Sequence, residues 1–240
     1  MNPLTQFKKT TILPLLIPLG LAWFGLLPRA QAVVPAPDGG YPGNNTAEGI
    51  NALFSLTTGF NNTAVGANAL LKTTTGSYNA GFGSRARENN IHGNFNMAVG
   101  TQALFKNTAD SNMAVGFRVL FNNTTGNNLT GIGAGALFSN ITGNNNTAIG
   151  AAALSANTTG TQNTATGWQA LFKNIAGSNN TPNGYQALLN NATGNFNTAN
   201  GGSALFSNTI GGNRPAGWLH RLVGWLASLQ SPPPNASEGK

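Results

Sequence analysis

A period of seventeen residues runs through most of the chain and limits what it can fold into. Exact or altered copies of the motif Asn-Thr-Ala-x-Gly occur ten times, and the glycine is present in every copy. These glycines are Gly49, Gly66, Gly83, Gly100, Gly116, Gly133, Gly150, Gly167, Gly184 and Gly201. The spacing is 17 residues, except for one spacing of 16 between Gly100 and Gly116. So regular a repeat predicts stacked, equivalent units, here ten over residues 45–213.

The length and composition of the unit select β-structure. Seventeen residues are too few for a helical-hairpin repeat, which needs about 33. The chain of 240 residues holds 32 glycines and 36 asparagines, and both residue types disfavour helix. We expect two short extended segments per unit, Thr-Ala-Val-Gly and x-Ala-Leu-Phe, joined by a glycine corner and an Asn-Thr-Thr-Gly turn. The fold class predicted is all-β, a parallel β-solenoid of ten 17-residue coils about 4.8 Å apart.

Two repeat positions indicate how the interior is filled, when each unit is numbered from its asparagine. The eighth is alanine in all units except that of Val119, and the ninth is leucine in all except that of Arg87. With the alanines, and often a phenylalanine at the tenth position, the leucines should form the core. They are Leu53, Leu70, Leu104, Leu120, Leu137, Leu154, Leu171, Leu188 and Leu205. Asparagines at the first and twelfth positions should form hydrogen-bonded ladders along the axis.

The fourth position predicts an association surface. Six consecutive units carry an apolar residue there, between units with polar ones. These residues are Val65, Phe82, Val99, Val115, Ile132 and Ile149. Because neighbouring strand residues face opposite sides, an inward alanine at the third position would turn this column outward, as a homo-oligomer interface. The opposite orientation, with the fourth position in the core, remains open.

The segments that flank the repeat have other roles. Residues 1–32 have the features of a signal peptide: Lys8 and Lys9, an apolar stretch and Ala30-Gln31-Ala32, with cleavage after Ala32. The alternative is an uncleaved membrane anchor. Residues 33–44 form a Pro/Gly-rich linker. Residues 214–240 carry an amphipathic-helix pattern and a Pro-rich tail, interpreted as a cap, a membrane contact or a degenerate tail.

Few residues are available for catalysis. The chain has no cysteine and two histidines, so we assign no catalytic, cofactor-binding or metal-binding residue and expect no enzyme. Glu88 and Asp110 can approach only across neighbouring coils, and we interpret His92, with its neighbours Arg85 and Arg87, as part of a solvated loop with local charge pairing. The basic residues are scattered along the sequence, which argues against a nucleic-acid partner.

The repeats resemble the heads of trimeric autotransporter adhesins. Asn62-Thr63-Ala64-Val65-Gly66 and Asn146-Thr147-Ala148-Ile149-Gly150 are similar to the motif of YadA-like head repeats, and related arrays occur in tail-fibre-like proteins. The resemblance covers residues 45–213 and implies a left-handed β-roll, assembled as a homotrimer and displayed on a bacterial surface for adhesion. The period here is longer than the usual head repeat, and no coiled-coil stalk or membrane barrel is recognised.

These features together predict a secreted or cell-surface adhesin or interaction module. Its partner would be an extracellular protein or polysaccharide surface, and no integral membrane anchor is expected once the signal peptide is removed. The alternatives are a passive structural or fibre element and an ice-binding solenoid. For ice binding, the threonines at the second position would form the array, but Ala80, Met97 and Met113 interrupt it.

Overall fold

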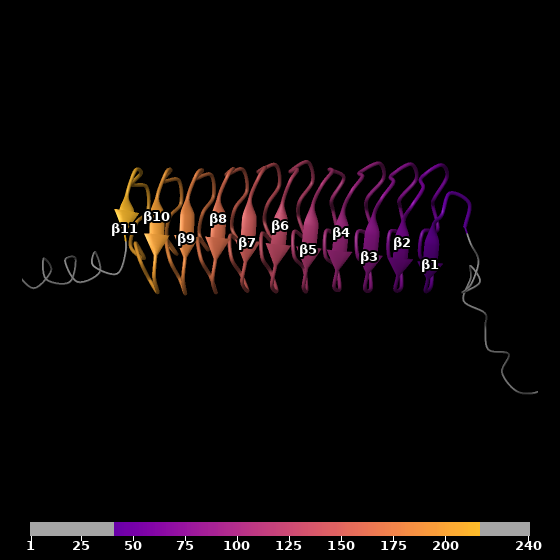
Figure 1. The fold of residues 1–240 in the computed structure, drawn as a ribbon, viewed down its shortest axis with the longest axis horizontal. Coiled ribbons are helices and arrows are strands. Elements are labelled where there is room, and N and C mark those ends of the chain that lie inside the picture. Colours follow the sequence, from indigo (N-terminus) through magenta and orange to yellow (C-terminus); the bar gives the residue numbers. More distant parts are fainter. Residues whose placement is uncertain (1–40, 217–240) are drawn as a thin grey trace, which may run out of the picture. The chain divides into compact units, whose positions relative to one another are not determined.

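The computed structural model describes residues 41–216, and this part of the chain is an all-β solenoid (Figure 1). One short strand per coil joins a single eleven-stranded parallel sheet, in which strands lie in sequence order. The strands are β1 (Thr46–Glu48), β2 (Thr63–Val65), β3 (Ala80–Phe82), β4 (Met97–Val99), β5 (Met113–Val115), β6 (Thr130–Ile132), β7 (Thr147–Ile149), β8 (Thr164–Thr166), β9 (Thr181–Asn183), β10 (Thr198–Asn200) and β11 (Pro215–Ala216). The parallel solenoid predicted from the period is confirmed, and residues 41–216 contain no helix.

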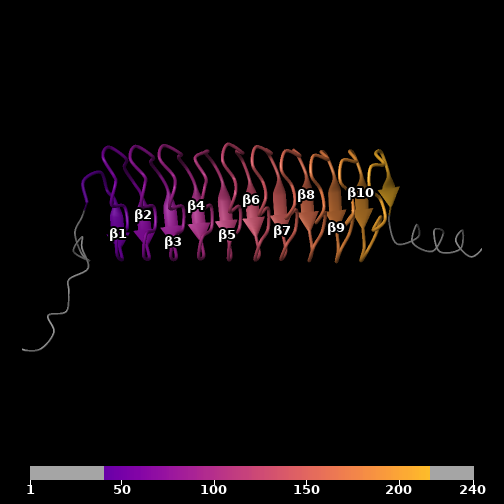
Figure 2. The ribbon, with the colours of Figure 1, turned by 180° about the vertical axis from the view of Figure 1, so that it is seen from behind.

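Equivalent repeat positions lie directly above one another. Thr63 pairs with Thr46 below it, and Val65 pairs with Glu48. The same register holds across the 16-residue unit, where Val99 pairs with Val115. Figure 2, seen from behind, shows the coils stacked without a break through this point. Each repeat position therefore becomes a column along the axis, and the surface of the solenoid is a set of such columns.

The interior contains the alanines of the third and eighth positions and the leucines of the ninth. Leu53, Leu70, Leu104, Leu120, Leu137, Leu154, Leu171 and Leu188 are buried, and Leu205, in the last coil, is half-buried. The apolar core is divided into two clusters, one in the first two coils and one from Ala86 onward. Arg87 lies where the two clusters would join, because it takes the place of the core leucine in its coil.

The second segment of each coil differs from the prediction, because it is a series of tight turns instead of a strand. In the seventh coil, Ala153 N–H donates to the carbonyl of Gly150 (3.2 Å), and Asn157 N–H donates to that of Leu154 (3.1 Å). Ala152 and Leu154 have φ values of 57° and 52°. In a strand, Ala153 and Leu154 would face opposite sides. The left-handed conformation of Leu154 turns both side chains into the core, which an extended segment cannot do.

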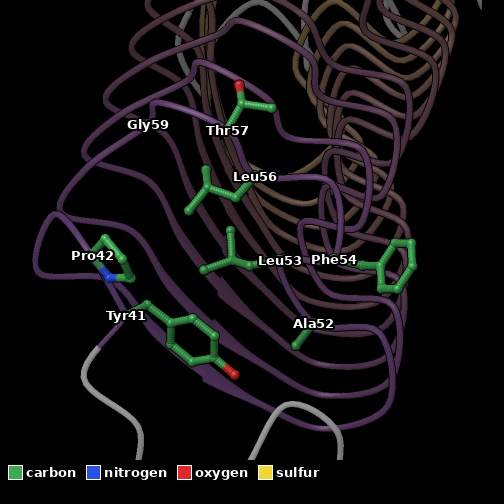
Figure 3. A pocket seen from close by; sticks show the side chains of 8 residues that line it. All are labelled: Tyr41, Pro42, Ala52, Leu53, Phe54, Leu56, Thr57 and Gly59. Atoms are coloured by element: carbon green, nitrogen blue, oxygen red, sulfur yellow. The ribbon is translucent and has the colours of Figure 1, made fainter.

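The phenylalanines of the tenth position also differ from the prediction, since they lie outside the core. Figure 3 shows Leu53 inside the first coil and Phe54 pointing away from it on the outer side. Phe54 is 72% exposed. Phe105, Phe121 and Phe138 are half-buried, because they stack on one another along the outside with centroids 5.0 and 5.4 Å apart.

The predicted asparagine ladders are present at both positions. At the first position, Oδ1 of Asn146 accepts the backbone N–H (2.9 Å) and Nδ2 (3.2 Å) of Asn163 in the next coil. Asn163 Nδ2 also donates to the carbonyl of Gly177 in its own coil, at 2.9 Å. At the twelfth position, Asn157 Nδ2 donates to Oδ1 of Asn140 (2.8 Å). Buried amides are thereby satisfied within the protein, as low-dielectric interiors require.

Two positions accept only the smallest side chains. Gly133 has a φ of 115°, and a Cβ there would lie 2.6 Å from the carbonyl carbon of Gly150 in the next coil. This close approach explains why the fifth position is glycine in every unit. At the third position, Gly131 replaces alanine because a Cβ there would lie 2.5 Å from Cγ1 of Val119, the enlarged side chain of the coil below.

The N-terminal end of the stack is partly covered by the start of the described chain. Tyr41 forms an antiparallel bridge with Asn45 and packs against the first cluster of the core. A hollow of about 320 Å³ remains beside it, lined by Leu53, Leu56 and other residues of the first coil (Figure 3). The expected signal peptide (residues 1–32), nearly all of the 33–44 linker and the expected amphipathic helix lie outside the described residues.

Loss of a core leucine should destabilise the solenoid strongly. Leu137→Ala and Leu154→Ala should each lower the free energy of unfolding by about 2–5 kcal/mol, because each leaves a cavity between two coils. Denaturant unfolding followed by circular dichroism measures the loss. Thr159→Ala, at an exposed position of a turn, serves as the control and should change stability little. Equal and small losses in all three variants would contradict the assignment of the core.

Candidate interaction surfaces

The outer face of the sheet is formed by two columns of side chains. In β2, β3 and β7, the middle residue is buried while the flanking residues are exposed or half-buried. The third position therefore faces the core and the fourth faces outward, as does the second. The alternative orientation, with the fourth position in the core, is wrong. At the third position the narrow interior holds alanine or glycine, and proline once, at Pro182.

The six apolar residues of the fourth position form one continuous outer strip from β2 to β7. Val65, Phe82 and Ile149 are 36%, 39% and 41% exposed. Val99, Val115 and Ile132 are half-buried by their neighbours along the column. With coils about 4.8 Å apart, the strip is about 24 Å long. A continuous apolar strip on a rigid face is typical of an association surface.

The strip widens in the third to fifth coils. There the second position is Ala80, Met97 or Met113 instead of threonine, so both outer columns of the sheet are apolar. A hollow of about 440 Å³ lies beside these residues and is lined on its other side by Tyr78 and Phe95. The substitutions that interrupt the threonine column therefore extend an apolar patch.

A short aromatic stack borders this patch and was not recognised in the sequence. The rings of Tyr78 and Phe95 are stacked with centroids 5.0 Å apart, and Phe60 meets Tyr78 edge-on at 5.1 Å. Tyr78 and Phe95 are one period of 17 residues apart, and this spacing is the sequence feature that indicates stacking between neighbouring coils. Most other coils have asparagine, serine or glutamine at this position, and Phe196 is aromatic without an aromatic residue one period away, so the motif itself did not indicate the stack.

The threonines of the second position form an uninterrupted outward column only in the C-terminal half, on β6 to β10. They are Thr130, Thr147, Thr164, Thr181 and Thr198. The column is broken on β3, β4 and β5, as the sequence indicated. A flat array of hydroxyl groups along the whole solenoid is therefore absent from the described residues.

His92, Glu88 and Asp110, the residues considered for catalysis in the sequence, each have a separate hydrogen-bond partner. His92 Nδ1 lies 2.8 Å from Oγ1 of Thr75, on the surface. Glu88 accepts from Arg85 Nε at 2.5 Å, at the tenth position. Asp110 belongs to the sixteenth position and accepts the backbone N–H of Asn94 at 2.6 Å. Within residues 41–216, no three His, Cys, Asp or Glu side chains are grouped as a metal site would require.

Arg87 was expected in a solvated loop, and this prediction is wrong. Its side chain is fully buried in the column otherwise formed by leucines, and its Nη1 donates to Oδ1 of Asn79. Nε and Nη2 have no hydrogen-bond partner among the described residues. The left-handed conformation of the ninth position, with a φ of 50° at Arg87, turns any side chain there into the core. That arginine replaces leucine at this position was visible in the sequence, but the inward direction of its side chain was not.

Burial makes the charge of Arg87 costly. Desolvation lowers the pKa of its guanidinium to about 9, although the carboxylate of Asp110 acts in the opposite direction. Proton loss is thus easier in the folded state than in the unfolded chain, but at neutral pH the buried guanidinium still carries its charge. Arg87 therefore destabilises the third coil at neutral pH.

Comparisons with known protein families, characterised proteins and solved structures found no match to this chain. Residues 41–216 include no helix of the length and apolar character needed to cross a bilayer.

Replacing Arg87 by the leucine of the other coils should stabilise the protein. Arg87→Leu should raise the free energy of unfolding at pH 7 by about 1–4 kcal/mol, because it removes a buried charge with two nitrogens that have no hydrogen-bond partner. Asn79 Oδ1 still accepts from Asn96, so no new unpaired acceptor is created. Thermal and denaturant unfolding measure the change. Lys173→Leu, which removes an exposed cation, is the matched control.

The effect should depend on pH in a defined direction. Folded Arg87 loses its proton above about pH 9, whereas the unfolded chain holds it up to the higher pKa of an ordinary arginine. Between these values unfolding takes up a proton, so the stability of the wild type rises with pH in this window. The advantage of Arg87→Leu should be full below pH 9 and decrease above it. A variant less stable than the wild type at pH 7 would contradict the burial of this charge.

Proposed function

We propose that this protein is an exported, non-enzymatic repeat protein that acts as a cell-surface adhesin or interaction module. The observation that carries the proposal is the outward apolar strip of the fourth position, held on a rigid parallel sheet. The export signal expected in residues 1–32 and the likeness of the repeats to YadA-like heads support it. The left-handed β-roll and a C-terminal helix, as cap or membrane contact, belong to the same proposal.

The strip is proposed to join three copies of the chain. Val65, Phe82, Val99, Val115, Ile132 and Ile149 would be buried between protomers, with Met97 and Met113 at the edge of the contact. Burial of such a column removes apolar surface from water along six coils. The fourth position is polar in the last three complete coils, at Thr166, Asn183 and Asn200, so protomers would be free to separate there.

The oligomer should dissociate when the strip becomes polar. The triple variant Val99→Thr, Val115→Thr and Ile132→Thr keeps β-branched side chains, so the strands should persist. Light scattering should give the mass of three chains for the wild type and of one folded chain for the variant, with an unchanged circular dichroism spectrum. Val99→Ile, Val115→Ile and Ile132→Val together preserve the apolar character and should keep the trimer. A monomeric wild type would reject this interface.

The adhesive function is tested with the protein displayed on the surface of beads. Beads coated with the wild-type protein should bind extracellular matrix proteins or polysaccharide above uncoated beads and above beads coated with an unrelated protein. Binding no greater than these controls would favour the alternative of a passive structural element.

A further inference from the structure

The exposed cations, which are scattered along the sequence, are gathered by the fold at two repeat positions of one outer turn. Lys72, Lys106 and Lys173 occupy the eleventh position, and Arg85 and Arg118 occupy the seventh. All five are exposed. The second to fifth coils carry one each, and the eighth coil carries Lys173. We call these five residues the cationic ridge.

Ring contacts show that the two positions share one surface. The guanidinium of Arg85 lies 4.9 Å from the centroid of Phe105, in the next coil. Lys106 Nζ and the guanidinium of Arg118 lie 5.7 and 5.5 Å from the centroid of Phe121. The outward phenylalanines of the tenth position therefore lie between the cations of the seventh and eleventh positions, and cation–π attraction holds the charges near them.

Further hydrogen bonds keep the cations in place. Arg118 Nε donates to Oε1 of Gln102 in the preceding coil, at 2.7 Å. Lys72 Nζ donates to Oδ1 of Asn89 in the following coil, at 2.8 Å. Side chains that are already ordered lose less entropy when a ligand binds. Since neither acceptor is charged, both cations keep their full charge for a partner.

The charge of the described surface is unevenly distributed. Beside the five cations of the ridge lies one carboxylate, that of Glu88, which is paired with Arg85. Among the remaining exposed or half-buried residues of the described chain there is one cation, Arg214, and there are two carboxylates, Glu48 and Asp110. The positive potential is therefore concentrated along one side of the stack. Such a line of charge attracts an extended polyanion.

The stacked rings argue against recognition of nucleic-acid bases. Phe105 and Phe121 are parallel within 7°, with centroids 5.0 Å apart, and Phe121 and Phe138 are arranged in the same way. Single-stranded nucleic acids are bound by aromatic faces that are open to bases. Because a ring is stacked on each side of Phe121, no base can insert between the neighbouring rings of this column.

We propose that the cationic ridge binds a linear anionic polysaccharide along the solenoid axis. Coils about 4.8 Å apart place four cations over about 14 Å, which suits a chain with a carboxylate or sulfate on successive sugars. This proposal rests on the proposed function and specifies its partner. It leaves the apolar strip free, because the ridge and the strand belong to different segments of each coil.

The test uses the purified full chain and heparin as the sulfated probe, with polygalacturonate as the carboxylated one and neutral dextran as the control. The triple variant Lys72→Gln, Lys106→Gln and Arg118→Gln spares the Arg85–Glu88 pair. Its Kd for heparin should rise at least about tenfold at 0.15 M salt. The slope of log Kd against log salt should fall by about 2 to 3, since each lost contact releases about one counterion fewer.

Matched variants separate the ridge from a general effect of charge. Arg118→Gln and Arg214→Gln each remove one exposed cation, and only Arg118→Gln should weaken binding. Equal weakening by both, or unchanged binding by the triple variant with a native circular dichroism spectrum, would overturn the ridge as the site. Tighter binding of single-stranded DNA than of either polysaccharide would overturn the assignment of the partner.

Bead adhesion distinguishes this proposal from the proposed function. Loss of bead adhesion in the triple variant supports the ridge as the adhesive surface. Adhesion equal to that of the wild type overturns that role while leaving an adhesin function in place. Wild-type beads that bind heparin but no other matrix component support the ridge and contradict adhesion to matrix proteins.

Discussion

The buried asparagine columns are the interaction on which the rest of the structure depends. A coil of seventeen residues has little apolar volume, and in most coils the core consists of alanines, one leucine and amide side chains. At the first position each asparagine joins three segments: its own strand, the strand of the next coil and the turn that closes its own coil. The asparagine of the second column, at the twelfth position, donates to the same turn carbonyl as the first, for example that of Gly160 in the seventh coil. Together they prevent one coil from sliding or rotating on the next.

This locking allows conformations that would otherwise be costly. Thirty non-glycine residues of the described chain have positive φ, among them the core leucines. A left-handed conformation costs an ordinary residue about 1–2 kcal/mol. Many of them are compensated in part by hydrogen bonds between coils, such as that from Leu154 N–H to the carbonyl of Ala170 (3.0 Å). The same rigidity turns single repeat positions into straight outer columns, so function can be assigned to columns instead of individual residues.

The period was sufficient to predict the parallel solenoid, the buried leucines and the asparagine ladders, since these follow from one residue type repeated in most coils. The outward fourth position was predicted from strand alternation alone, with the opposite orientation left open. The second segment was misjudged because alternation assigns Ala153 and Leu154 to opposite faces, and only their backbone conformation shows that both face inward. Arg87 was misplaced for the same reason, because the left-handed backbone of the ninth position turns its side chain into the core. The cationic ridge was missed because Arg85 and Lys106 are far apart in sequence and occupy different repeat positions, and they meet only through Phe105 and the stacking of coils.

Native-state hydrogen exchange tests the role of the asparagine columns most directly. The amide protons of Asn163, Asn180 and Asn197 are each donated to an asparagine Oδ1 in the preceding coil, at 2.9, 3.0 and 3.0 Å. Asn146 occupies the same position, but the preceding coil has Leu129, which offers no side-chain oxygen. The three bonded amides should exchange slowly, and that of Asn146 should exchange fastest among the four. Equal protection of all four would show that the coils are held in register by another interaction.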